Sequence, residues 1–180
     1  MIVLLRFVGI LNAAVWFGAA IFFTFGAAPG IFSPELKRLF GPAYPGLFAQ
    51  SVVERFFLLQ YCCGGLALLQ QLAEWVYLGK SFHKITVGVL LGLCALSLLG
   101  GFALQPKMKE WHRIKYSTEL YRRELYPPEQ KARAARLFGV WHGVASSMNL
   151  LALGGLAFYL WRMANPGAGT RFVPAGKFRS

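Results

Sequence analysis

The polar side chains with the greatest chemical potential in this sequence lie in one apolar run near its C-terminal end. His142, Ser146 and Asn149 follow one another at intervals of four and three residues. Because an α-helix repeats every 3.6 residues, this spacing places all three on one helical face. Asn12 is a fourth polar residue within an apolar run. We expect the four to form a polar cluster that faces protein, since an unpartnered polar group in hydrocarbon is costly.

Two interpretations of His142 are open at this point. The imidazole could bind a haem or a metal ion, or relay protons. Alternatively, a neutral imidazole could form a hydrogen bond with Asn12, a serine or a backbone carbonyl and so fix the helix register. His112 lies in a charged segment and His83 in a short link, so neither is obviously placed as a second axial ligand. We therefore predict no cofactor and no metal site, with haem at His142 as the alternative.

The sequence contains none of the common catalytic motifs. It has no G-x-S-x-G, no Walker loop, no H-E-x-x-H and no dinucleotide fingerprint. Aspartate is absent, and the chain has only seven glutamates. Paired-carboxylate catalysis and a cage for a hard cation therefore have few groups to use. We predict that the protein is not an enzyme.

The composition is that of a membrane protein. Of the 180 residues, 56% are hydrophobic and 14% are charged, whereas an average soluble domain carries about 25% charged residues. A helix needs about 20 apolar residues to cross the hydrocarbon core, and four runs are of about this length: 7–28, 56–73, 85–104 and 137–161. We predict an all-α membrane protein with four transmembrane helices in an antiparallel bundle, forming a single domain over residues 1–163.

The segments between these runs carry signals of their own. Ser33 is placed to cap a helix that begins at Pro34. The mixture of apolar and basic residues that follows is typical of a short helix lying at the lipid interface. The third run should end at Gln105 and Pro106, because proline disfavours a helix interior. The second and third runs are joined by a tight link, which predicts a helical hairpin.

The long basic segment between the third and fourth spans is expected to form a helical hairpin. Tyr126 and the two prolines after it break the segment. Pro128 should then begin a helix that continues without interruption into the fourth span. The tail, 164–180, is basic, rich in glycine and proline and without periodicity, so we expect it to be disordered.

Two glycine pairs have the spacing that permits close packing of membrane helices. Gly88 and Gly92 are four residues apart in the third span, and Gly139 and Gly143 are four apart at the start of the fourth. Small residues at this spacing let two helix backbones approach each other. We predict that these glycines pack against neighbouring helices.

The net charge is +12, but its distribution argues against nucleic acid as a partner. The basic residues flank hydrophobic spans instead of forming a soluble basic face, so we expect them to meet anionic lipid headgroups. Twelve of the Lys and Arg residues lie on the side of the two larger loops and seven on the side of the termini. Because positive residues favour the cytoplasm, we expect the larger loops to be cytoplasmic and the termini to lie outside.

The start of the fourth span also resembles a known family. Residues 138–150 read FGVWHGVASSMNL, which resembles the pattern F-x-x-aromatic-H-G-x-S-S-x-x-N-L of the bacterial domain-of-unknown-function 4149 family. That family is similar to eukaryotic transmembrane protein 205. The matching residues are Phe138, Trp141, His142, Gly143, Ser146, Asn149 and Leu150. Ala145 departs from the pattern, because it stands where the first serine is expected. The resemblance implies a four-helix bundle in the bacterial inner membrane and no established chemistry.

Three functions are compatible with these features. The small size, the sparse chemistry and the glycine faces favour an accessory or structural subunit that packs against partner subunits of a larger membrane complex. A haem- or quinone-binding redox protein that uses His142 is one alternative. A transporter of a small solute or a metal is another, and it would require a water-accessible path past Asn12, His142, Ser146 and Asn149.

Overall fold

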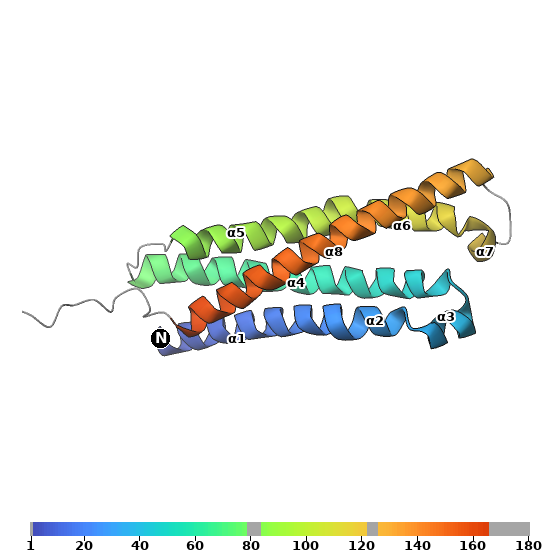
Figure 1. Cartoon of the computed structure of the whole chain (residues 1–180). Coiled ribbons are helices and arrows are strands. Elements are labelled where there is room, and N and C mark those ends of the chain that lie inside the picture. Colours follow the sequence, from blue (N-terminus) through green and yellow to red (C-terminus); the bar gives the residue numbers. More distant parts are fainter. Residues whose placement is uncertain (1, 79–83, 122–125, 166–180) are drawn as a thin grey trace, which may run out of the picture.

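The computed structural model describes residues 2–78, 84–121 and 126–165, and within them it contains helices and no strand. Figure 1 shows an elongated bundle in which successive long helices run in opposite directions. The elements in chain order are α1 (Ile2–Ile21), the π-helical segment η1 (Phe22–Ala27), α2 (Ala28–Ile31), α3 (Pro34–Phe40), α4 (Tyr44–Leu78), α5 (Lys84–Leu98), the π-helical segment η2 (Leu99–Leu104), α6 (Gln105–Lys115), α7 (Ser117–Tyr121) and α8 (Pro128–Ala164).

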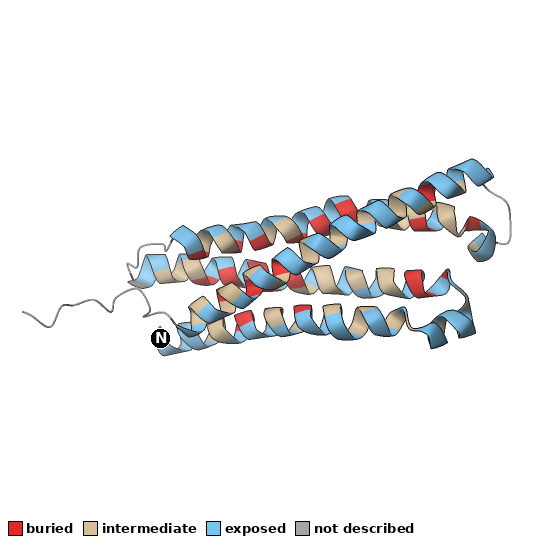
Figure 2. Ribbon diagram, viewed as in Figure 1, coloured by how far each residue is buried: buried red, intermediate tan, exposed pale blue. Residues whose placement is uncertain are grey.

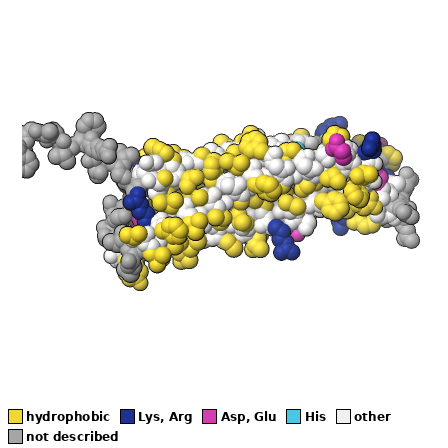
Figure 3. Space-filling view, turned by 90° about the horizontal axis from the view of Figure 1, so that it is seen from below, with side chains coloured by type: hydrophobic (Ala, Val, Ile, Leu, Met, Phe, Trp, Pro, Cys, Tyr) yellow, Lys and Arg dark blue, Asp and Glu magenta, His cyan; other side chains and the backbone are white. Residues whose placement is uncertain are grey.

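Four of the continuous helical stretches are long and apolar enough to cross a membrane: Val3–Ile31, Tyr44–Tyr77, Lys84–Lys115 and Pro128–Ala164. Each contains one of the four apolar runs found in the sequence. The prediction of an all-α membrane protein with four transmembrane helices is therefore confirmed. Figure 3 shows one face of the molecule largely covered by hydrophobic side chains, as expected for a surface that meets lipid.

The prediction that the third helix ends at Gln105 and Pro106 is wrong. Segment η2 leads directly into α6, and Gln105 has helical dihedral angles. A proline inside an α-helix removes one hydrogen bond and crowds the preceding turn. Here Pro106 is the second residue of α6, directly after the π-helical segment η2, so the regular α-helical hydrogen bonding is already interrupted where the proline lacks its N–H. The third helix therefore continues beyond the predicted span through α6, which ends at Lys115.

The helix starts follow the local signals. The Ser33 side chain accepts a hydrogen bond from the Leu36 N–H at 3.4 Å, and Pro34 begins α3. Pro128 begins α8, which runs unbroken to Ala164. The predicted tail from residue 166 onward, and the link at 79–83, lie outside the described residues.

The best-packed part of the bundle is the half near the N-terminus of α1. Trp16 and Tyr159 are both fully buried, and their rings meet edge to face with centroids 6.4 Å apart. Leu90 and Leu156 belong to the same cluster. Gly64 allows the close approach here, since a Cβ on it would lie 3.1 Å from Cys94 Sγ. Figure 2 shows that the buried positions lie on the inner faces of the helices.

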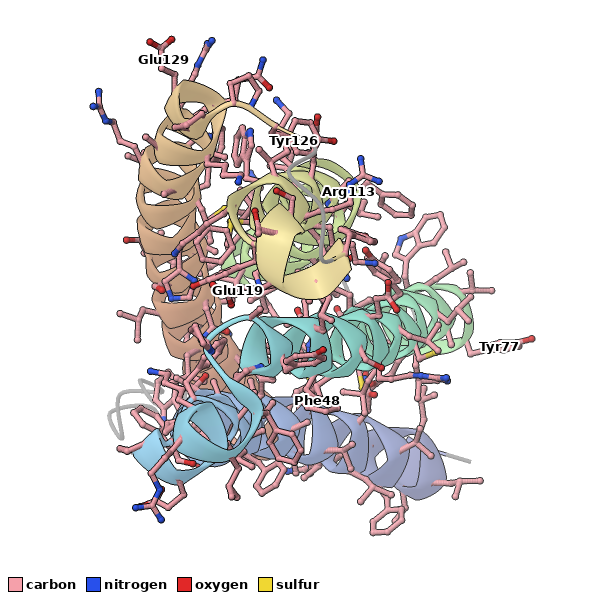
Figure 4. All side chains as sticks on the ribbon, turned by 90° about the vertical axis from the view of Figure 1, so that its right-hand side faces the viewer. Phe48, Tyr77, Arg113, Glu119, Tyr126 and Glu129 are labelled. Atoms are coloured by element: carbon pink, nitrogen blue, oxygen red, sulfur yellow. The ribbon has the colours of Figure 1, made fainter. Side chains whose placement is uncertain are left out.

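Helix α8 crosses the rest of the bundle. It packs against α6 near its own start and against α1 near its end, as Figure 1 shows. Figure 4 looks onto the end of the bundle where α3, α7 and the start of α8 lie, and it shows Arg113, Glu119 and Glu129 on separate helices at this end. We call this end, which carries the two larger loops, the loop end of the bundle.

The four predicted packing glycines face away from the interior of this chain. A Cβ added at any of them would meet no atom within 4 Å: Gly88, Gly92, Gly139 and Gly143. All four are exposed. Their role in helix packing therefore stays a prediction. Because no described helix of this chain packs against them, the partner would have to be a helix of another protein chain.

Candidate functional site

A cavity of about 610 Å³ lies between the helices in the half of the bundle toward the loop end. Its volume falls within the range of roughly 300–1,000 Å³ that is usual for small-molecule sites. The walls come from η1 and α2, from α4, from η2 and α6, and from α8, and most of the lining side chains are apolar. On α8 the lining extends from Phe138 to Ala152, which corresponds to about 21 Å along a helix. The cavity is therefore elongated along the bundle axis.

Two π-helical segments form part of its walls. Thr24 belongs to η1 and Gly100 to η2, and both line the cavity. A π-helical turn inserts an extra residue into a helix and changes the direction of the side chains around it, and such turns are frequent at functional sites. On the η1 side, Phe23 stacks on Phe56 of α4 with ring centroids 4.3 Å apart. The two irregular segments thus coincide with the part of the bundle that is not filled by its own side chains.

The inner end of the cavity, toward the centre of the bundle, has polar groups that are already paired. Ser97 donates a hydrogen bond to Gln60 Oε1 at 2.6 Å, and both residues are buried. Asn149 Nδ2 donates to Thr24 Oγ1 at 2.8 Å, which joins α8 to η1. Because these side chains hydrogen-bond each other, the inner end presents few free polar groups to a ligand.

The outer end of the cavity, toward the loop end of the bundle, is different. Gln105 and His112 line it there, and buried nitrogens of both side chains lack a well-formed hydrogen bond within the described chain. His112 has 2% of its surface exposed; neither ring nitrogen forms a hydrogen bond of good geometry, but the Ala43 backbone lies beside the ring as a weak partner. Buried polar groups are nearly always hydrogen-bonded, so an unpaired one needs a water molecule or a ligand. The unsatisfied polarity of the site therefore lies at its outer end.

The His112 ring is held by its neighbours. Its centroid is 4.9 Å from that of Tyr116 and 5.9 Å from that of Phe138. Its Nε2 packs against the α4 backbone at Gly46, where an added Cβ would collide with the ring. Gly46 is thus one of the few positions in the chain where the absence of a side chain is required by a close approach.

His142 lies on the α8 wall of the same cavity. Its ring is nearly parallel to that of Phe138, at 11° with centroids 6.1 Å apart. Both His142 and Ser146 are exposed, so the cavity is open along this face of α8. The Ser146 hydroxyl donates to the His142 backbone carbonyl at 2.9 Å and not to the imidazole.

The four residues of the predicted polar cluster do not all meet. His142, Ser146 and Asn149 line the cavity together. Asn12 instead donates a hydrogen bond to the Cys63 backbone carbonyl at 2.9 Å, among the buried residues near the N-terminal end of α1. It precedes Thr24, the partner of Asn149, by twelve residues of continuous helix, which is about 18 Å. The structure therefore divides the cluster into a cavity group and a separate structural residue.

His112 is the functional candidate that the sequence interpretation missed. It lies in a strongly charged segment, which favoured an exposed loop position. Its spacing from Gln105 and Met108, seven and four residues, does place all three on one helical face. That signal is only useful once the helix is known to continue through Pro106, because otherwise the face of the third span ends before His112.

The fold and the cavity together define an all-α integral membrane protein with four membrane-crossing helices and a small-molecule-sized site near one end. Among the described residues, no group of three or more His, Cys, Asp or Glu side chains could hold a metal ion.

More particularly, the chain belongs to the family described as domain of unknown function 4149, whose family model matches residues 11–117. That match begins within the first span, includes the second and third spans and α6, and ends before residues 138–150 of α8. No curated protein and no solved structure shows significant similarity to the chain.

Proposed function

We propose that this protein binds an elongated amphipathic molecule from the membrane in the cavity between η1, α4, α6 and α8. The observation that carries the proposal is the uneven polarity of the site. Paired polar groups at the inner end leave mainly apolar wall for a hydrocarbon chain, whereas the unpaired nitrogen of Gln105 at the outer end can donate to a polar head. The opening along His142 and Ser146 would let such a molecule enter from the bilayer.

The same contacts bear on the haem and quinone alternative. A haem iron held by His112 and His142 would need an accessible nitrogen on each, but the His112 ring is buried among Tyr116, Phe138 and the Gly46 backbone. Haem binding would therefore rest on His142, whose side chain is exposed along α8. A quinone has a polar ring and an apolar chain and is one member of the proposed class of ligands.

A polar transport path that includes Asn12 is less favoured, because the Asn12 amide donates a hydrogen bond to a backbone carbonyl away from the cavity.

Blocking the cavity tests the proposal. Ala145 lines the cavity on α8, whereas Ala157 on the same helix is exposed and does not. Ala145→Phe should fill part of the site, and Ala157→Phe adds the same ring on the outside. We expect native mass spectrometry of the protein, extracted in mild detergent, to show bound lipophilic molecules in the wild type and in Ala157→Phe. We expect them to be lost from Ala145→Phe.

A second cavity variant, Ala49→Phe on α4, guards against a folding defect peculiar to α8. The thermal midpoint of each variant shows whether it is folded. If both folded cavity variants retain the same bound mass as the wild type, the molecule lies outside the cavity and the proposal is wrong. The proposal would also be wrong if the wild-type protein is purified without a bound lipophilic molecule and binds none when it is added.

An accessory role in a larger complex is a second candidate, and the outward-facing glycines favour it. Gly88 and Gly92 on α5, and Gly139 and Gly143 on α8, present small residues at helix-packing spacing on the exterior. The setting we propose is the bacterial inner membrane, with the larger loops in the cytoplasm. Native mass in mild detergent tests this role: stoichiometric membrane partners are expected, and a lone 20.0 kDa species would contradict it.

A further inference from the structure

Basic side chains surround the outer end of the cavity, and aromatic rings of the site hold them there. The Lys115 ammonium lies 5.5 Å from the ring centroid of Phe138, which lines the cavity, and 4.7 Å from that of Tyr116. Lys115 follows His112 by three residues on α6, so both lie on the same side of that helix. A cation over an aromatic face is attracted by the ring quadrupole, which restricts where the ammonium can go.

Two further lysines approach the same end from other directions. The Lys107 ammonium lies 5.6 Å from the ring centroid of Trp141, the neighbour of His142 in sequence. The Lys37 ammonium, from α3, lies 5.9 Å from the ring centroid of Phe32, which also lines the cavity. Two helices far apart in sequence, α3 and α6, therefore place three positive charges near aromatic rings at or beside the cavity wall.

Among the described residues, none of these three lysines forms an ion pair. Lys109, on the same helix, forms an ion pair with Glu54 of α4. Within the part of the chain that the structure describes, Lys37, Lys107 and Lys115 have no carboxylate partner. Positive charges with no carboxylate at ion-pair distance favour the binding of an anion, all the more where the neighbouring groups are apolar and exclude water.

We infer that the ligand of the cavity is an anionic lipid, bound with a phosphate headgroup among Lys37, Lys107 and Lys115 and one acyl chain in the cavity. This inference rests on the proposed function and specifies its ligand. The phosphate oxygens would accept hydrogen bonds from the lysine ammonium groups and from the unpaired nitrogen of Gln105. The chain would extend toward Gln60 and Ser97, where the protein's polar groups already satisfy each other.

Dioleoyl phosphatidic acid and dioleoylglycerol make a matched pair of probes, because they differ only in the phosphate. We would titrate each into the delipidated protein in a neutral detergent and measure dissociation constants by native mass spectrometry. Each lysine close to a lipid phosphate contributes about fivefold in affinity. We therefore expect Lys107→Gln/Lys115→Gln to bind phosphatidic acid about 25-fold more weakly, with binding of dioleoylglycerol unchanged.

The control variant is Lys131→Gln, which removes one unit of charge at the same end of the bundle, against two in the double variant. Lys131 donates a hydrogen bond to Thr118 Oγ1 at 2.6 Å, and it does not line the cavity. We expect it to bind both probes as the wild type does. A loss of about fivefold in phosphatidic acid affinity in Lys131→Gln, the share of one charge, would show that net charge alone attracts the lipid, which overturns the inference.

The remaining outcomes separate the two proposals. One outcome would overturn the headgroup inference and leave the cavity function standing. In that outcome phosphatidic acid and dioleoylglycerol bind equally well, the lysine variants do not change their binding, and Ala145→Phe abolishes the binding of both. If neither probe binds, or Ala145→Phe binds both as the wild type does, the cavity function itself is wrong. Displacement of phosphatidic acid by an equal concentration of inorganic phosphate would identify a site for the free anion and overturn the lipid assignment.

Discussion

Replacing Gly46 by alanine tests how tightly α4 and α6 pack around the outer end of the cavity. A Cβ at this position would lie 2.6 Å from Cδ2 and 2.9 Å from Cε1 of His112, closer than carbon atoms approach without displacement. The imidazole has little room to move on one side, since Tyr116 and Phe138 flank it. Gly46→Ala must therefore push the His112 ring into the cavity or move the start of α4 away from α6.

The size of the effect follows from two opposing terms. Overpacking a well-packed position costs about 1–3 kcal/mol, whereas replacing glycine by alanine within a helix stabilises by about 0.5–1 kcal/mol. We expect a net loss of about 1–2 kcal/mol of unfolding free energy, because the clash exceeds the helical gain. In a protein of this length that loss lowers Tm by roughly 2–8 °C.

A double-mutant cycle provides the assay. Thermal unfolding in detergent would be measured for the wild type, Gly46→Ala, His112→Ala and the double variant. Because His112→Ala removes the ring that is struck, only the helical gain remains in that background and Gly46→Ala should stabilise by about 0.5–1 kcal/mol, giving a coupling of about 1–3 kcal/mol. Gly65→Ala is the matched control on the same helix, since its Cβ would meet no atom within 4 Å. Equal costs of Gly46→Ala with and without the His112 ring would refute this account of the packing.

Two further substitutions contrast a buried polar contact with an exposed one. Asn12→Leu removes the hydrogen bond to a backbone carbonyl of α4 and should cost about 0.6–1.7 kcal/mol in thermal unfolding, while lipid binding in the distant cavity is unchanged. Coincident loss of lipid binding would mean that the two regions are coupled. Lys109→Gln breaks the ion pair with Glu54; the Lys109 side chain is 37% exposed and that of Glu54 is 51% exposed. The substitution should lower the unfolding free energy by less than about 1 kcal/mol, and by less still in high salt. A larger, salt-independent cost would contradict the assignment of a solvated pair.

The local features of the fold could be predicted from the sequence because they depend on neighbouring residues. The hydropathy of each run sets whether a helix can lie in hydrocarbon, which made the four spans predictable. Ser33 and Pro128 begin helices through contacts within one turn, so their roles do not depend on the rest of the chain. The placement of His142, Ser146 and Asn149 along one wall likewise follows from helical periodicity alone.

The composition of the site could not be predicted in the same way, because it depends on how the helices are rotated and crossed. His112 reaches the cavity only because η2 carries the third helix through Pro106 and because Gly46 leaves room for its ring. Periodicity places Gly88 on a face of α5, but packing between helices decides whether that face points inward or outward.

What the sequence by itself determined was therefore the class of protein, its membrane spans and the face on which each polar residue lies. What only the tertiary structure decided was which faces meet. Asn12 and Asn149 are both polar residues within spans, yet one bonds the α4 backbone and the other bonds Thr24 at the cavity wall. The physical reason is that hydropathy and helix signals act over a few residues, whereas a cavity is what remains when side chains from distant segments fail to fill the space between crossing helices.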